Sequence, residues 1–155
     1  MTADVTPAEL GEATALLSDL VSIYSPSGGE GRILERIEHL CESVGLTTRR
    51  VPAEIGRDSL VLGASREPAL VIAAHLDTIT PNWPDATVPR VEDGVLHGLG
   101  SVDDKGGVAA CLLAARWLSG EGVDLDDLPA AFAFPVDEES GGSGSRSLAI
   151  ELAPR

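Results

Sequence analysis

Two stretches of the sequence are apolar without interruption. Residues 69–74 (ALVIAA) lead directly into His75, and residues 129–135 (PAAFAFP) lead into an acidic segment. Short apolar runs without alternation are typical of strands buried on both faces, in a sheet that is covered by helices. We therefore expect residues 69–74 to form the central strand of such a sheet.

Other apolar residues recur at helical spacing or in short alternating stretches bounded by turn residues. The elements that these patterns predict are a helix beginning at Pro7 and capped by Thr6, helices over 30–44 and 107–118, a helix beginning near Arg146, an edge strand over 46–52, a strand over 59–63 and a hairpin over 90–97. Together they predict an α/β fold with a mixed, mostly parallel central sheet and helices on both faces.

The length and net charge of the chain limit the number of domains and the kinds of partner that it can have. The 155 residues suffice for one domain, and a net charge of −14 argues against nucleic acid or an anionic membrane as partner, because both attract basic surfaces. No apolar run approaches the roughly 20 residues of a membrane span. The first residues, MTADVTPAEL, resemble neither a signal nor a transit peptide, so we expect a cytoplasmic protein.

Cys41 and Cys111 lack CxxC spacing and are expected to be buried free thiols, whereas His39 is expected at the surface.

Acidic or imidazole side chains follow three of the predicted elements. They are His75 and Asp77, Asp103 and Asp104, and Glu138 and Glu139. In a sheet covered by helices, the loops after parallel strands gather at one edge, which is where α/β proteins place their sites. We therefore expect the side chains of His75, Asp103 and Glu139 to converge.

This set of side chains suits metal-assisted hydrolysis. Imidazole and carboxylate ligands favour zinc, with cobalt or manganese as alternatives. Two ions about 3.5–4 Å apart need a carboxylate between them, and a further carboxylate must deprotonate the attacking water. Taken singly, each pair has a plainer interpretation: Asp103 and Asp104 as helix capping, and Glu138 and Glu139 as solvated surface.

At these residues the chain resembles the co-catalytic metallohydrolase family of aminoacylases, carboxypeptidase G, succinyl-diaminopimelate desuccinylase and acetyl-lysine or acetylornithine deacetylases. The matching segments are AAHLDT (73–78), VEDGVLHGLGSVDDKGG (91–107) and PVDEESGGSGS (135–145), in the family's order. The similarity begins near SPSGGE (25–30) and continues to residue 155. It implies a zinc-peptidase-like catalytic domain.

The resemblance assigns a role to each matching position. His75 would bind one metal ion and Asp77 would orient His75, while Asp103 would bridge two divalent ions. Glu138 would be the general base and Glu139 would bind the second ion. The implied reaction is hydrolysis of an amide bond in an N-acyl amino acid or small peptide. Asp104 and Lys105 would have no direct catalytic role and would serve the loop and the helix start.

Chains of the resembled family are longer and carry a further acidic ligand, a late histidine ligand and an inserted lid domain with dimer contacts. His97, in the hairpin, does not match the late ligand. We therefore expect residues 1–155 to be the N-terminal portion of the catalytic domain, without the lid and dimerisation domain, from a protein that forms a homodimer when whole. Two alternatives stay open: an inactive fragment or binding module that retains the fold, and a single-metal hydrolase that uses only His75 and Asp103.

Overall fold

The computed structural model describes residues 5–53, 56–63 and 68–153. In chain order the elements are α1 (Pro7–Ser22), α2 (Gly31–Ser43), β1 (Thr48–Pro52), β2 (Asp58–Leu62), β3 (Leu70–Ala73), β4 (Arg90–Glu92), β5 (Val95–His97), α3 (Lys105–Gly120), the 3-10 helix η2 (Leu125–Asp127), β6 (Ala130–Phe134) and α4 (Ser143–Glu151). No helix within these ranges is both long and apolar enough to cross a membrane.

The main sheet has the strand order β1-β2-β6-β3. Strand β2 runs antiparallel to both β1 and β6, and β3 runs parallel to β6 with Ile72 opposite Phe132. The predicted mixed sheet is thus confirmed. Its parallel share is smaller than expected, because β3–β6 is the single parallel pairing among the described strands.

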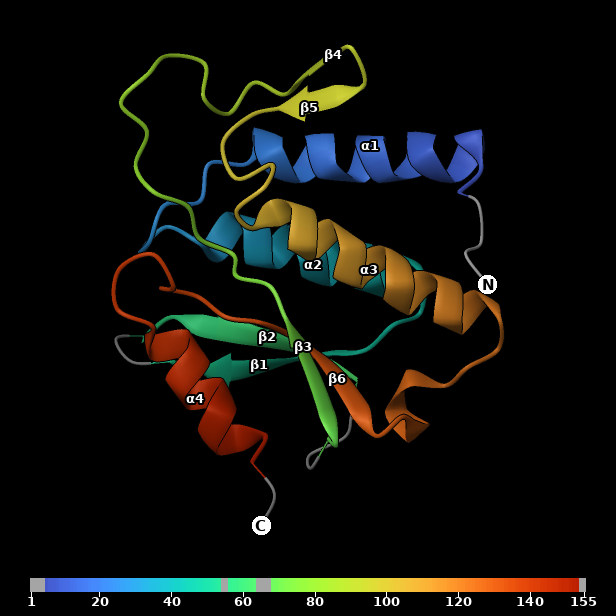
Figure 1. The fold of residues 1–155 in the computed structure, drawn as a ribbon. Coiled ribbons are helices and arrows are strands. Elements are labelled where there is room, and N and C mark those ends of the chain that lie inside the picture. The colour runs from blue at the N-terminus through green and yellow to red at the C-terminus, as the bar shows by residue number, and fades with distance from the viewer. Residues whose placement is uncertain (1–4, 54–55, 64–67, 154–155) are drawn as a thin grey trace.

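Helices cover both faces of this sheet, as predicted (Figure 1). Helices α2 and α3 lie on one face with α1 beyond them, and α4 lies on the opposite face. The larger apolar core fills the space under α1, α2 and α3, and a smaller one lies under α4. The smaller core consists of Val51, Val61, Ala131, Ala133, Leu148 and Leu152.

Local chemistry explains why several elements begin and turn where predicted. Thr6 and Glu9 form a reciprocal capping box at the start of α1. At the turn of the β4–β5 hairpin, Asp93 and Gly94 both have positive φ, 51° and 80°, which a two-residue hairpin turn of this kind requires. His39 is exposed and Cys41 and Cys111 are buried free thiols, as expected.

The expectation that residues 69–74 form the central strand is wrong. Strand β3 is an edge strand, and the central position next to it belongs to β6. Leu70, Val71 and Ile72 are 55%, 41% and 42% exposed, whereas Phe134 in β6 is fully buried. An apolar run indicates that side chains on both faces of a strand can pack against an apolar core. It does not indicate which of two such strands occupies the middle of the sheet.

Two helices begin earlier than the sequence pattern indicated, α3 at Lys105 and α4 at Ser143. Both starts contain glycine, which has low helix propensity and so concealed the true first turn. In α4 the glycine is required by packing, because a Cβ on Gly144 would collide with the backbone of Val136.

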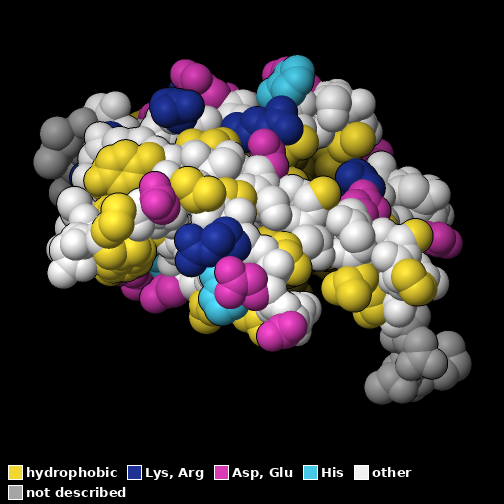
Figure 2. All heavy atoms as spheres, turned by 90° about the horizontal axis from the view of Figure 1, so that it is seen from above, with side chains coloured by type: hydrophobic (Ala, Val, Ile, Leu, Met, Phe, Trp, Pro, Cys, Tyr) yellow, Lys and Arg dark blue, Asp and Glu magenta, His cyan; other side chains and the backbone are white. Residues whose placement is uncertain are grey.

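The strongly negative net charge is not gathered on the face above α1 and the β4–β5 hairpin. Figure 2 shows that acidic and basic side chains are interspersed there, with small hydrophobic groups between them. This face therefore presents no single-sign patch.

Candidate metal centre

Three side chains from separate loops converge at one end of the sheet. His75 follows β3, Asp103 precedes α3 and Glu139 follows β6, and one ligand atom from each lies within 4.8 Å of the other two. The convergence arises because β3 and β6 are parallel neighbours whose carboxyl ends meet at the same edge. The predicted geometry is confirmed, while the role of each residue in binding metal stays a prediction.

The buried imidazole of His75 is held at both ring nitrogens. Its Nδ1 lies 2.9 Å from the carbonyl oxygen of Asp77, so Nδ1 carries the proton and donates it. Its Nε2 lies 2.9 Å from Oδ1 of Asp103. The side chain of Asp77, together with that of Asp103, outweighs burial and raises the pKa of His75 to about 9. With its pKa raised, the ring carries a proton on Nε2 that it donates to Asp103, and a metal ion bound there would take the place of that proton.

Asp77 holds the site together in a way that the sequence did not reveal. Its fully buried carboxylate accepts hydrogen bonds from the backbone N–H groups of Glu138 and Glu139, both at 3.0 Å, and from Oγ of Ser27 at 2.6 Å. Burial opposes ionisation, but these bonds and the one with His75 outweigh it and lower the pKa of Asp77 to about 2. The carboxylate itself lies 3.6 Å from Nδ1 of His75, so the closer contact with the ring is the Asp77 carbonyl.

The two adjacent glutamates occupy different environments. Glu139 belongs to the converging group, and burial together with the negative charge of Asp103 raises its pKa. The side chain of Glu138 is 52% exposed, with Oε2 at 3.8 Å from Nε2 of His75. Both carboxylates thus lie near His75, with that of Glu138 on the exposed side of the site.

Asp104 and Lys105 serve the structure around the site. Asp104 is the N-cap residue of α3, and its Oδ2 accepts a hydrogen bond of 3.2 Å from the backbone N–H of His75. The side chain of Lys105 is fully buried and donates to the carbonyl of Ile23 at 2.5 Å, and burial lowers its pKa to about 8. Both contacts tie loops to the start of α3, although the side chain of Asp104 makes no capping hydrogen bond to the helix itself.

A cleft of about 320 Å³ opens beside the candidate ligands and includes Asp103 and Glu139 in its lining. The polar loop over residues 80–89 contributes Trp83 to the lining. Ile79 and Val102 add further exposed apolar surface. The cleft therefore combines acidic groups at one end with an apolar wall.

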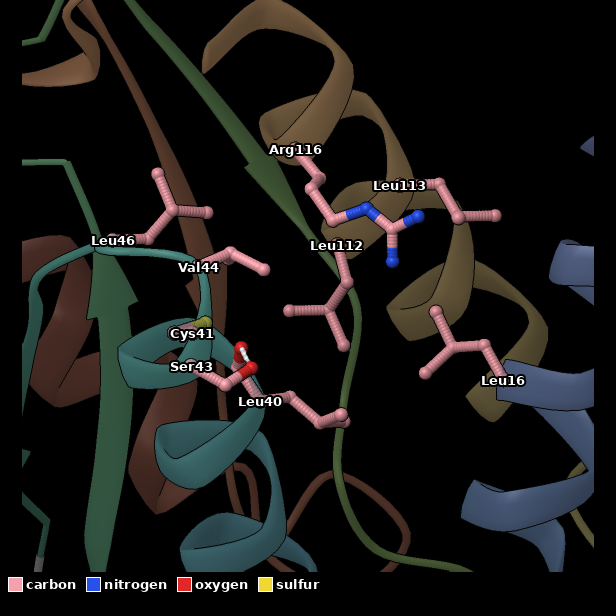
Figure 3. A pocket seen from close by; sticks show the side chains of 9 residues that line it. All are labelled: Leu16, Leu40, Cys41, Ser43, Val44, Leu46, Leu112, Leu113 and Arg116. Atoms are coloured by element: carbon pink, nitrogen blue, oxygen red, sulfur yellow. Dashed lines mark hydrogen bonds between the residues drawn. The ribbon is translucent and has the colours of Figure 1, made fainter. Parts of the chain in front are cut away.

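A second cavity lies between α1, α2 and α3, away from these groups (Figure 3). It holds about 60 Å³ and is lined mainly by aliphatic side chains such as Leu16, Leu40 and Leu112, with Arg116 at one side. Burial raises the pKa of Cys41 in its wall to about 12, so this thiol stays protonated. The cavity offers no converging polar atoms and is a packing gap between helices.

Comparisons with known proteins agree with the geometry. Two curated relatives are a probable carboxypeptidase of Emericella nidulans, 34% identical over 96% of this chain, and a [LysW]-lysine/[LysW]-ornithine hydrolase of Saccharolobus islandicus, 31% identical over 90%. The chain spans 37% and 36% of their lengths.

Among solved structures, a tripeptidase of Staphylococcus aureus superposes with a TM-score of 0.73 and 26% identity, over 94% of this chain and 41% of that one. Human carnosine dipeptidase 1 gives the same TM-score, 0.73, at 22% identity, over 92% of this chain and 35% of that one, and shows a shared fold. The model of peptidase family M20/M25/M40 matches residues 71–155, which include all three converging side chains. With more than half of its residues matched, the chain belongs to peptidase family M20/M25/M40.

Proposed function

We propose that the protein hydrolyses an amide bond of an N-acyl amino acid or small peptide with the help of two divalent metal ions, zinc above all, with cobalt or manganese as alternatives. The observation that carries this proposal is the convergence of His75, Asp103 and Glu139 within 4.8 Å in a chain of a peptidase family. One imidazole and two carboxylates form a donor set that suits zinc.

The proposed roles are those that the family resemblance implies. His75 would hold one ion, Glu139 would hold the other, and Asp103, whose side chain is 77% exposed, would serve both. When bound, the ions supply positive charge that makes water easier to deprotonate and polarises the amide carbonyl.

Glu138 is proposed as the general base. Its side chain stands at the open side of the site and its backbone is fixed by Asp77, so its carboxylate can reach a water on the solvent side of the ligands. It takes the proton of that water and passes it to the leaving amine nitrogen, which must be protonated before the C–N bond breaks. The adjoining cleft receives the apolar part of the substrate against Ile79, Trp83 and Val102.

Zinc titration of the purified chain tests the metal site. We expect two ions per chain, and the variant His75→Ala is expected to weaken binding by more than about 100-fold, beyond the usual effect of outer-shell changes. His97→Ala, in the β4–β5 hairpin, is the matched control and should bind as the wild type does. One ion per chain would support the single-metal alternative, and no binding would support the inactive binding module.

Turnover tests the role of Glu138. Against a panel of N-acetyl amino acids and dipeptides, Glu138→Gln should lower kcat by about 10²–10⁴-fold, because the positioned base is lost. Zinc stoichiometry should stay unchanged, since Glu138 is proposed not to be a ligand. Near-normal turnover by Glu138→Gln would show that another group takes the proton.

The proposal also includes a cytoplasmic location and a homodimer for the whole protein. The free, buried thiols of Cys41 and Cys111 fit a reducing compartment. Cell fractionation and size-exclusion chromatography with light scattering test the two points. Recovery outside the cytoplasm, or a monomeric mass, would contradict the respective part.

A further inference from the structure

The loop that carries Glu138 and Glu139 is anchored on its far side by a buried ionic cluster. In this cluster the guanidinium of Arg57 binds Oε1 of Glu30 at 3.0 Å and Oδ1 of Asp137 at 2.9 Å. The side chains of Glu30 and Asp137 are 3% and 9% exposed, and that of Arg57 is 21% exposed. Two carboxylates this deeply buried need a cation between them, because desolvated like charges repel strongly.

The cluster reaches the glutamate loop through Asp137. Its backbone N–H donates to Oε1 of Glu30 at 3.2 Å, which is the same oxygen that Arg57 binds. Its Oδ2 accepts from Oγ and the backbone N–H of Ser143, at 2.8 and 3.2 Å, and its Oδ1 accepts from Oγ of Ser140 at 2.5 Å. The segment 137–143 is therefore folded around one carboxylate, with the two glutamates inside the fold.

Asp77 holds the same loop from the opposite side. Its carboxylate accepts the backbone N–H groups of Glu138 and Glu139, both at 3.0 Å. The two glutamates are thus held by two sets of contacts. Asp77 binds their backbone from the side of β3, and Arg57 and Glu30 bind the preceding residue, Asp137, from the other side. Each set depends on a different part of the chain, so each can be removed separately.

We propose that Arg57 is a positioning residue for the proposed reaction, which sets the place of Glu138 and Glu139 by joining Glu30 to Asp137. The inference rests on the proposed function for its catalytic meaning, but the positioning itself is a property of the loop. Without the guanidinium, two buried carboxylates face each other, so one of them must take up a proton or the loop that carries Asp137 must move, and either change loosens the hold on the loop. Arg57 touches neither the candidate ligands nor the cleft in the contacts described.

The chain offers a matched control in Arg50. This arginine also joins two carboxylates, Glu38 at 2.6 Å and Asp58 at 3.6 Å, but it has no described contact with the glutamate loop. Arg50→Met and Arg57→Met therefore remove the same group, the first from a partly exposed pair of carboxylates and the second from a buried pair. Only the second change is expected to reach the site.

Amide hydrogen exchange of the metal-free protein, followed by NMR, measures the positioning directly. In Arg57→Met, protection of the Glu138 and Glu139 N–H groups is expected to fall by about tenfold or more, because local opening of the loop becomes easier. Arg50→Met should leave both amides as protected as in the wild type. Unchanged protection in Arg57→Met would overturn the proposal, whatever the chain binds.

Cobalt titration, read from the visible absorption of the bound ion, measures the consequence. We expect Arg57→Met to bind about 10- to 100-fold more weakly, Arg57→Lys to recover part of the loss, and Arg50→Met to match the wild type. If Arg57→Met does not fold, Arg57→Gln, which keeps a polar side chain but removes the charge between Glu30 and Asp137, takes its place in both measurements with the same expectation. A wild-type chain that binds no cobalt would contradict the proposed function, whereas equal binding by wild type and Arg57→Met would contradict this inference alone.

Discussion

Strands β3 and β6 are parallel neighbours of similar apolar character, yet they differ in burial. Every residue of β3 is exposed, while four of the five residues of β6 are buried. The difference disappears beyond the carboxyl end of β3, where residues 74–78 are all buried. There the loops after β6 and before α3 cover the chain, and Asp77 and His75 make their contacts with them.

The interactions that hold the strand β3 therefore differ from those that hold the candidate site after it. The body of β3 is held by backbone pairing with β6 along one edge. Its carboxyl end is held by side chains and loops, including Ser27, Asp77 and Asp104. An exposed strand such as β3 can therefore still hold His75 in a defined position, because the hydrogen bonds that hold it come from residues beyond the end of the strand.

The largest expected effect compares the bodies of the two strands. Phe134→Ala should lower the free energy of unfolding by about 3–5 kcal/mol, because it opens a cavity in the main core. Ile72→Ala, at a side chain that is 42% exposed, should lower it by less than about 1 kcal/mol. Chemical denaturation measures both, with Val61→Ala in the buried strand β2 and Val71→Ala in β3 as a second pair of equal chemistry. Equal losses in the two strands would mean that β3 is covered in solution.

The next effect concerns the support behind the carboxyl end of β6. A Cβ on Gly144 would collide with the backbone N and O of Val136 and with Oγ of Ser59. Gly144→Ala should therefore lower the free energy of unfolding by about 1–3 kcal/mol, as overpacking does. Gly31→Ala in the first turn of α2 meets nothing within 4 Å and should be neutral or slightly stabilising. Calorimetry measures the melting temperatures of both variants. If Gly144→Ala melts at the same temperature as Gly31→Ala, α4 must move away from Val136 at little cost.

A smaller effect tests the carboxyl end of β3. Ser27→Ala removes the 2.6 Å hydrogen bond to Oδ2 of Asp77 and should cost about 1 kcal/mol. Ser43→Ala removes a hydrogen bond to the carbonyl of Leu40 at an exposed helix end and should cost less than about 0.5 kcal/mol. Urea unfolding distinguishes them. If both substitutions have the same small effect, this end of β3 does not depend on Ser27.

The smallest effect tests the helical cover over the central strands. Burial raises the pKa of Cys41 on α2 to about 12, so the native thiol stays protonated in a range where the unfolded thiol ionises. The unfolded state then binds fewer protons, and stability falls as pH rises above about 8.5, by about 0.8 kcal/mol between pH 7 and pH 9.

This loss should be absent from the pH profile of Cys41→Ala when the two profiles of unfolding free energy are subtracted. The subtraction is necessary because Lys105, whose pKa burial lowers to about 8, changes stability with the opposite sign in the same range. Identical profiles would mean that water reaches Cys41 in the folded chain.

Much of this arrangement was predictable from local patterns. The apolar runs located β3 and β6, the Thr6–Glu9 capping box located α1, and the polar residues after each run indicated where a site would form. Convergence of His75, Asp103 and Glu139 followed from the rule that parallel strands end at one edge.

The order of the strands was not predictable in the same way, because burial of β3 depends on its neighbours and not on its own residues. The supporting contacts were missed for a related reason. Arg57 comes from a segment without a motif, and the match over SPSGGE (25–30) gave Glu30 no role. Their partner Asp137 is far away in the sequence. The available signal was the position of Asp137, a third acid directly before the glutamate pair.

The dependence of β3 on β6 has a consequence for how the chain acquires its site during synthesis. The carboxylate of Asp77 accepts a hydrogen bond from the backbone N–H of Glu139, which is synthesised 62 positions later. Strand β3 likewise has no strand partner other than β6 among the described residues. A nascent chain that has emerged only as far as α3 therefore presents an unpaired apolar edge next to an incomplete set of ligands. When β6 arrives, it pairs with one edge of β3 and brings Glu139 to His75 and Asp103 in the same step, while the other edge of β3 stays unpaired among the described residues.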